Sequence, residues 1–355
     1  MGSHMRAEIL FIGAAMAATT AHPAAAQDRN QQVAWCMNAN NVFSSDLQIG
    51  GCTALIQSGT LDSSKLADAF DNRGNAYFAQ NDYPRAIVDY SEAIRINPQH
   101  ANAFNGRGSA YDAQKEYPRA IADFNEAIRL NPQDAYPFNN RGNAFYAQKD
   151  YPRAIADFNE AIRLNPQDAN AFNGRGSVYD ARKEYLRAIA DFNEAIRLNP
   201  QDAYAFYNRG RVYYAQKDYA RAIADYSEAI RINPRYVFAF TNRGRVYYAQ
   251  KDYTRAIGDY NEAIRLNPQD ANAFYNRGNA YGTQKDYPHA IADFSEAIRL
   301  NPQFALAFRY RAYAYHLLKN YPRAIADYSE AIRLNPQDAD SYSLREKVEL
   351  LQHSQ

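Results

Sequence analysis

Residues 67–100 have the sequence ADAFDNRGNAYFAQNDYPRAIVDYSEAIRINPQH, and close variants of this stretch follow without a spacer up to residue 338. The pair Asn97-Pro98 near its end recurs every 34 residues. A fixed period of this length is typical of stacked supersecondary units. The sequence therefore predicts eight repeats, numbered 1 to 8, at 67–100, 101–134, 135–168, 169–202, 203–236, 237–270, 271–304 and 305–338.

Each repeat contains two runs with helical periodicity. In repeat 1, Phe70, Gly74 and Tyr77 lie on one face of a first helix, and the stretch 86–94 forms a similar face on a second helix. Asp82 and Pro84 between the two runs predict a turn with proline in the first helical turn, and Asn-Pro ends the second helix. Each repeat is therefore predicted to be a helical hairpin. Small and aromatic residues on the facing sides are expected to form its core.

These positions resemble the tetratricopeptide repeat, over about three-quarters of the chain. The resemblance implies an all-α fold, a right-handed superhelical solenoid of helix-turn-helix hairpins. It also implies that the first helices line a concave groove that usually binds peptides or protein segments. The residues that carry the resemblance in repeat 1 are Phe70, Gly74, Tyr77, Ala86, Tyr90, Ala93 and Pro98.

One departure from the family pattern is systematic, because the seventh residue of every repeat is arginine where leucine is usual. These residues are Arg73, Arg107, Arg141, Arg175, Arg209, Arg243, Arg277 and Arg311. One aspartate per repeat lies beside the core aromatic of the second helix: Asp89, Asp123, Asp157, Asp191, Asp225, Asp259, Asp293 and Asp327. An anion-binding stripe is one interpretation. Equal numbers of acids and arginines favour a structural ladder of ion pairs, since unpaired buried charges are costly.

The ends of the chain differ from the repeats. Residues 1–5 resemble an expression-tag remnant, and 6–26 have the basic, apolar and small-residue regions of a secretory signal with cleavage expected after Ala26. Export, to a bacterial periplasm, would allow Cys36 and Cys52 to form a disulfide, with a free thiol pair as the alternative. We expect a degenerate capping hairpin at 27–66 and a C-terminal capping helix at 339–355.

Composition and motifs exclude several function classes. The net charge of +1 gives no basic footprint for nucleic acid. We find no catalytic constellation, phosphate loop or metal-spaced cluster, so the chain is predicted to be a non-enzyme without metal or cofactor. The apolar stretch in the signal region is too short to span a membrane.

Residues that the repeats do not share are the candidates for recognition. Aromatic residues outside the four recurring core positions concentrate in repeats 5 to 7, with two arginines at one groove position. The candidate ligand-binding residues are Tyr204, Tyr207, Arg211, Tyr214, Phe238, Thr241, Arg245, Tyr248, Asn272, Tyr275 and Asn279. Tyrosine and arginine lead interface energetics, so this surface suits a peptide with acidic groups and aromatic or apolar anchors. The alternative is that these tyrosines only pack between neighbouring hairpins.

Elsewhere the groove is polar and acidic. Repeats 2 and 4 carry Asn105, Ser109 and Asp112, and Asn173, Ser177 and Asp180.

The sequence favours a scaffold that binds a protein or peptide segment in the groove. Two alternatives stay open: a self-assembling structural repeat protein, and a binder of acidic glycan or peptidoglycan fragments. If the apolar stretch 9–18 is retained, it is itself a candidate occupant of the groove.

Overall fold

The computed structural model describes residues 23–38 and 42–354, and every regular element in these ranges is an α-helix. The predicted tag and nearly all of the predicted signal lie outside the described residues. The helices are α1 (Pro23–Met37), α2 (Ser45–Gln57), α3 (Ser63–Ala79), α4 (Tyr83–Ile96), α5 (Ala101–Ala113), α6 (Tyr117–Leu130), α7 (Ala135–Ala147), α8 (Tyr151–Leu164), α9 (Ala169–Ala181), α10 (Tyr185–Leu198), α11 (Ala203–Ala215), α12 (Tyr219–Ile232), α13 (Val237–Ala249), α14 (Tyr253–Leu266), α15 (Ala271–Thr283), α16 (Tyr287–Leu300), α17 (Ala305–Leu317), α18 (Tyr321–Leu334) and α19 (Ala339–His353).

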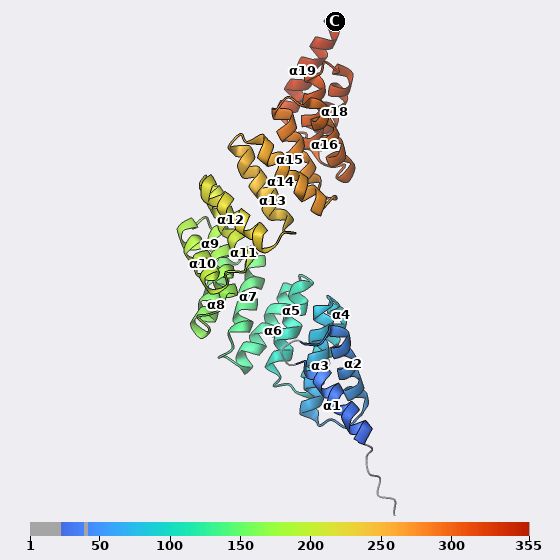
Figure 1. Ribbon diagram of the computed structural model, residues 1–355, viewed down its shortest axis with the longest axis vertical. Coiled ribbons are helices and arrows are strands. Elements are labelled where there is room, and N and C mark those ends of the chain that lie inside the picture. The colour runs from blue at the N-terminus through green and yellow to red at the C-terminus, as the bar shows by residue number, and fades with distance from the viewer. Residues whose placement is uncertain (1–22, 39–41, 355) are drawn as a thin grey trace, which may run out of the picture. The chain divides into compact units, whose positions relative to one another are not determined.

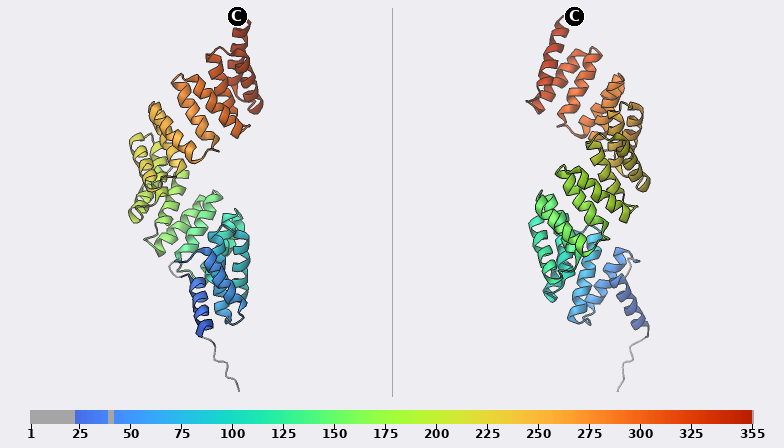
Figure 2. Two further views of the ribbon diagram at one scale, coloured as in Figure 1. Left: turned by 45° about the vertical axis from the view of Figure 1, so that its right-hand side comes forward. Right: turned by 90° about the vertical axis from the view of Figure 1, so that its left-hand side faces the viewer.

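The chain forms two compact parts, an N-terminal part up to Ala144 and a C-terminal part from Phe145. Within each part, antiparallel hairpins follow one another in chain order, as Figure 1 and the two views of Figure 2 show. The odd-numbered helices from α3 to α17 are the first helices of repeats 1 to 8, and the even-numbered helices from α4 to α18 are the second helices. The predicted fold class, an all-α solenoid of helix-turn-helix hairpins, is confirmed for each part.

Local sequence explains where each hairpin turns. In repeat 1, Asn81 has a left-handed backbone with φ of 60°, and Asp82 then accepts a hydrogen bond from the backbone N–H of Arg85. That bond satisfies one of the unpaired N–H groups at the start of α4. The second helix ends at Ile96, because Pro98 blocks its continuation.

Fewer aromatic side chains are fully buried in the core of each hairpin than the sequence predicts. In repeat 1, Ala86 and Tyr90 are fully enclosed, whereas Phe70, Tyr77 and Tyr83 are only half-buried. Glycine permits this close approach, as repeat 5 shows: a Cβ added to Gly210 would lie 2.9 Å from the ring of Tyr226. The predicted role of Gly74 and its equivalents is confirmed, but three of the four predicted core aromatics lie at the edge of the core.

The predicted ladder is present in the structure. In repeat 5, Arg209 donates from Nε to one carboxylate oxygen of Asp225 at 2.8 Å and from Nη2 to the other at 2.7 Å. The guanidinium also lies over the ring of Phe206, 5.6 Å from its centroid. The same two-point pairing joins Arg73–Asp89, Arg107–Asp123, Arg175–Asp191, Arg243–Asp259, Arg277–Asp293 and Arg311–Asp327. Planar two-point pairs of this kind fix geometry as well as adding energy.

Each ladder arginine also reaches the preceding repeat. Nη1 of Arg209 donates to Asn193 of repeat 4 at 2.6 Å, and Nη1 of Arg243 donates to Ser227 of repeat 5 at 2.9 Å. One guanidinium therefore ties the two helices of its hairpin together and holds the neighbouring hairpin. The arginines are structural, which favours the ladder over the anion-binding stripe.

Both ends of the array continue this pattern. Arg73 donates to Thr53 of α2 at 3.1 Å, which places α2 as the second helix of a hairpin before repeat 1. In that hairpin Cys36 of α1 and Cys52 of α2 form the predicted disulfide. At the other end, Arg345 of α19 donates to Ser329 at 3.4 Å, as a ladder arginine does. Cleavage after Ala26 remains a prediction, and α1 includes that position.

The ladder predicts unequal effects for two acids on α12. Replacing Asp225 with Ala leaves Arg209 partly buried without its partner and should lower the unfolding free energy by about 3 kcal/mol. Replacing Glu228, which pairs with Arg231 on the exposed face, should cost about 0.5 kcal/mol or less. Urea unfolding followed by circular dichroism measures both. Equal losses would contradict a structural ladder.

The disulfide predicts a local effect of reduction. The bond closes a loop between residues 16 apart, so opening it should destabilise the α1–α2 hairpin by roughly 3 kcal/mol in the chain-entropy model. Amide hydrogen exchange with and without reductant should show faster exchange in α1 and α2 and unchanged exchange in repeats 5 to 8. Unchanged protection of α1 and α2 would overturn this expectation.

Candidate functional site

Four hollows lie along the first helices of the C-terminal part, and they share lining residues. The first is lined by Phe238, Thr241, Asn242, Arg245, Asp270, Asn272, Tyr275, Asn276, Phe304 and Leu306. The second is lined by Tyr214, Arg245, Tyr248, Ala249, Tyr260, Asn276, Asn279 and Tyr310. The third is lined by Tyr248, Asn279, Gly282, Thr283, Lys285, Tyr287, Phe294, Tyr310, Tyr313, Ala314 and Leu317. The fourth is lined by Arg309, Tyr310, Tyr313, Asp340, Ser343 and Leu344. Because each hollow shares residues with the next, they form one trough, which we call the C-terminal groove.

The structure brings most of the predicted ligand-binding residues together. Eight of the eleven line the C-terminal groove: Tyr214, Phe238, Thr241, Arg245, Tyr248, Asn272, Tyr275 and Asn279. The other three, Tyr204, Tyr207 and Arg211, are on α11 outside these four hollows. The predicted site is therefore shifted towards the C-terminus.

Two of the predicted tyrosines pack between hairpins. The ring of Tyr207 lies 5.0 Å from that of Tyr236, and its hydroxyl accepts a hydrogen bond from Asn242. Tyr275 packs in the same way on Phe304, with ring centroids 4.9 Å apart. Burial raises the pKa of both tyrosines. For these two residues the packing alternative describes what the structure shows.

Other aromatic groups are open to solvent. Tyr204 is 61% exposed and Phe238 is 63% exposed, although both are large and apolar. Contiguous exposed apolar patches mark interaction surfaces, whereas single exposed hydrophobic residues are common on any protein. Phe238 lies at the start of α13 and forms one edge of the groove.

The two groove arginines have different surroundings. Arg211 forms an ion pair with Asp180, at 3.2 Å. Arg245 lies over the ring of Tyr214, 5.5 Å from the centroid, and donates to the side-chain oxygen of Asn242 at 3.3 Å. Among the described residues, no carboxylate forms an ion pair with Arg245. Its charge is therefore available in the middle of the groove.

The remaining predicted residues complete the groove wall. The Tyr248 hydroxyl is 3.0 Å from the Thr283 hydroxyl. Asn279 lines both the second and the third hollow. Thr241 donates to the backbone of its own helix. Asn272 is exposed and lines the first hollow.

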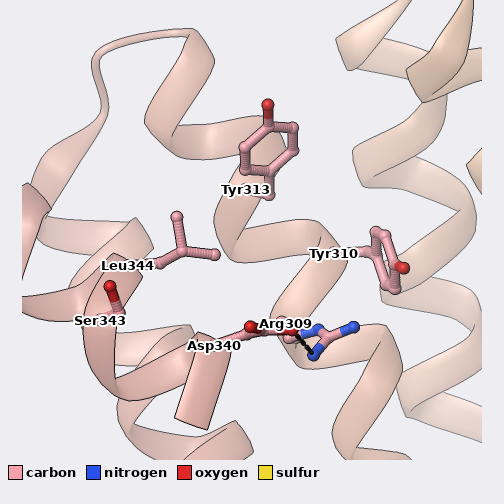
Figure 3. Close-up of a pocket in the computed structure, with 6 residues that line it drawn as sticks. All are labelled: Arg309, Tyr310, Tyr313, Asp340, Ser343 and Leu344. Carbon is pink, nitrogen blue, oxygen red and sulfur yellow. Dashed lines mark hydrogen bonds and ion pairs between the residues drawn. The ribbon is translucent and has the colours of Figure 1, made fainter. Parts of the chain in front are cut away.

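Sequence reasoning missed the end of the groove, which Figure 3 shows. Tyr310 and Tyr313 of α17 line this end together with Leu344 of α19. The ring of Tyr310 lies 5.8 Å from that of Tyr275 on α15. Arg309 pairs with both Asp338 and Asp340, at 3.0 and 3.2 Å. Tyr310 stands where the three preceding repeats have Asn208, Asn242 and Asn276. This replacement of asparagine by tyrosine is visible in the sequence and could have indicated the end of the groove.

The groove face of the N-terminal part has a different character. Asp71 of α3 is 8% exposed, and its Oδ1 has no hydrogen-bond partner. Its other oxygen accepts a bond from Asn75. Burial is the main reason that the pKa of Asp71 rises to about 6, with His100 lowering it and Asp68 raising it. His100 Nδ1 accepts from the backbone N–H of Ala103, so its Nε2 carries a proton and donates to Asp68 at 3.1 Å.

The described residues contain no group of three or more His, Cys, Asp or Glu arranged to hold a metal ion. In the same ranges, none of the helices has the length and apolar character that crossing a bilayer requires.

Family models match the chain along the array. Models described as tetratricopeptide repeat match residues 72–135, 139–203, 192–224, 271–304 and 305–338, and a model described as TPR repeat matches 210–251 and 244–285. Together these matches extend over 72–135 and 139–338. The chain belongs to the tetratricopeptide-repeat family. Among curated proteins no sequence match is found.

Solved structures share the fold at low sequence identity. The Cut9–Hcn1 hetero-tetramer of the APC/C is 17% identical, with a TM-score of 0.58 over 87% of this chain. This chain spans 60% of that structure's chain. PilF of Pseudomonas aeruginosa is 22% identical, with a TM-score of 0.52 over 58% of this chain and 94% of its own. A tetratricopeptide repeat protein of Parabacteroides merdae is 19% identical, with a TM-score of 0.52 over 66% of this chain and 93% of its own.

The buried Asp71 predicts a pH dependence. Its pKa in the folded chain, about 6, is above the ordinary value of 3.8, so the folded state binds this proton more tightly. Stability from this group is therefore highest below pH 4 and falls as the pH rises to about 6. Asp71→Asn should stabilise repeat 1 at pH 7.5 by up to about 3 kcal/mol, and the gain should vanish near pH 4.

The control for this prediction is Glu92→Gln on the second helix of the same repeat, whose carboxylate pairs with Arg95 on the exposed face. It should change the unfolding free energy by about 0.5 kcal/mol or less at either pH. Urea unfolding at the two pH values measures both variants. If Asp71→Asn destabilises the protein at pH 7.5, burial of the charged Asp71 carboxylate does not cost stability and the prediction is wrong.

Proposed function

We propose that this chain is a non-enzymatic interaction protein that binds an extended segment of a partner protein in its C-terminal groove. The observation that carries the proposal is the continuity of the four hollows across α13, α15, α17 and α19. Their volumes, between about 260 and 390 Å³, suit successive side chains of a peptide better than one large ligand. Repeat arrays use such extended concave surfaces for binding.

The chemistry of the groove favours a segment with an acidic group between apolar or aromatic side chains. Arg245 offers a guanidinium without a carboxylate partner, and it lines the first two hollows. Phe238 and Leu306 on one side, and Tyr310 on the other, offer apolar contact. An aspartate or glutamate at Arg245 would gain a charge-assisted hydrogen bond that the free protein lacks.

We also propose that the chain is exported to a bacterial periplasm. Two features support this: the signal-like sequence of residues 6–26 and the disulfide between Cys36 and Cys52. Structural disulfides persist in oxidising compartments and are rare elsewhere.

The proposal predicts that Arg245 governs partner capture. The full chain, Arg245→Glu and the control Arg231→Glu serve as baits for an extract of exported proteins. Arg231 lies on the exposed face of α12 and has the same charge, so it controls for net charge. A partner should be retained by the first and third baits and lost from the second.

A defined probe makes the same test quantitative. A labelled six-residue peptide of alternating glutamate and leucine should bind Arg245→Glu at least about tenfold more weakly than the parent chain, a loss of about 1.4 kcal/mol. Equal binding to all three proteins would contradict the proposal. Retention of the chain itself alone would favour self-assembly. Retention of acidic glycan in place of protein would favour the saccharide alternative.

A further inference from the structure

The C-terminal part contains an internal example of how its groove binds a guanidinium. Arg211 of α11 lies 3.2 Å from Oδ2 of Asp180 on α9, and Asp180 precedes Arg211 by 31 residues. At the same register, Arg245 lies over Tyr214. The ninth residue of a first helix therefore faces the twelfth residue of the first helix before it.

The N-terminal part has the same carboxylate without the arginine. Asp112 of α5 occupies the position in repeat 2 that Asp180 occupies in repeat 4, and the residue 31 positions later is Asn143 of α7. One oxygen of Asp112 is buried with no hydrogen-bond partner, and the residue as a whole is partly exposed. Burial raises the pKa of Asp112, and no cation opposes that rise. Asp180 has the same burial effect, but Arg211 opposes it.

The two parts share one register, so the comparison is valid. Asn140 donates to Asn105 at 3.0 Å in the N-terminal part, and Asn208 donates to Asn173 at 3.1 Å in the C-terminal part. Both pairs join equivalent positions, 35 residues apart.

We infer that the groove face of α5 and α7 is a cation-binding site, in which Asp112 receives a lysine or arginine side chain of a partner segment. The class of ligand follows from Asp180, because that equivalent carboxylate already binds a guanidinium in this chain. Asp112 supplies an acceptor for which the structure shows no donor, and a cationic side chain would provide that donor. This site lies in the N-terminal part and does not require the Arg245 site.

The test uses the full chain and labelled, amidated hexaarginine as the probe, followed by fluorescence anisotropy at pH 7.5 and low salt. The chain has a net charge of only +1, so bulk attraction for a basic peptide is absent. Asp112→Asn should weaken binding about fivefold or more. The matched control Glu126→Gln removes one acid from the exposed face of the same repeat and should change the affinity less than about twofold.

A third variant tests the geometry directly. Asn143→Arg introduces the arginine that repeat 5 has, so it should pair with Asp112 within the chain and block the probe. It should weaken hexaarginine binding as much as Asp112→Asn does, and combining both changes should add no further loss. Melting temperatures confirm that each variant is folded.

Several results would overturn the inference. They are no binding of hexaarginine at concentrations up to about 1 mM, equal effects of Asp112→Asn and Glu126→Gln, or unchanged binding by Asn143→Arg. Binding of the glutamate–leucine peptide to the same variants should stay at the parent level. A loss there alone would concern the C-terminal groove and leave the cation site standing.

Discussion

The array depends on the two-point ion pair between an arginine of each first helix and an aspartate of the second. The third guanidinium nitrogen of the arginine donates a hydrogen bond to the preceding hairpin, as Arg209 does to Asn193. One side chain therefore joins the two helices of its own hairpin and also holds the neighbouring hairpin in place. A leucine at that position would pack, but it would not fix the register between neighbours. The half-buried phenylalanines, such as Phe206, shield one face of each guanidinium from water. The ladder therefore provides part of the stabilisation between the two helices that a wider apolar core would otherwise provide.

This arrangement separates structural charges from available ones. Because the ladder arginines are fully occupied, an arginine or aspartate on the groove face must be judged by its own partners. Arg211 and Asp180 form an ion pair, whereas neither Arg245 nor Asp112 forms an ion pair with another of the described residues. Arg245 can therefore offer a cation to a ligand, and Asp112 can offer an anion. The same repeat thus leaves a different unpaired charge on the groove face of each compact part.

Sequence periodicity predicted the hairpins and the ladder, because both depend on positions that recur at a fixed spacing. The disulfide was predicted from the expected export to an oxidising compartment. Periodicity did not predict that Arg211 is paired, since this depends on a 31-residue register between neighbouring first helices. It placed Phe70, Tyr77 and Tyr83 in the core, whereas small alanines bring the helices so close that only Tyr90 fits between them. The sequence prediction did not include Tyr310 and Tyr313 of repeat 8, because the aromatic residues outside the core positions concentrate in repeats 5 to 7. The position of Tyr310, where earlier repeats have asparagine, was the available signal.

The distinction between ladder arginines and the available Arg245 is tested most directly by observing the arginine side chains themselves. In protein labelled with ¹⁵N-arginine, the Nε–H resonances are recorded while the glutamate–leucine peptide is added, and Arg245→Lys assigns one of them. The account predicts that the ladder resonances exchange slowly with water and do not move, while the Arg245 resonance shifts on binding. Movement of the ladder resonances with no change at Arg245 would show that the ladder arginines bind the ligand, and would contradict the account.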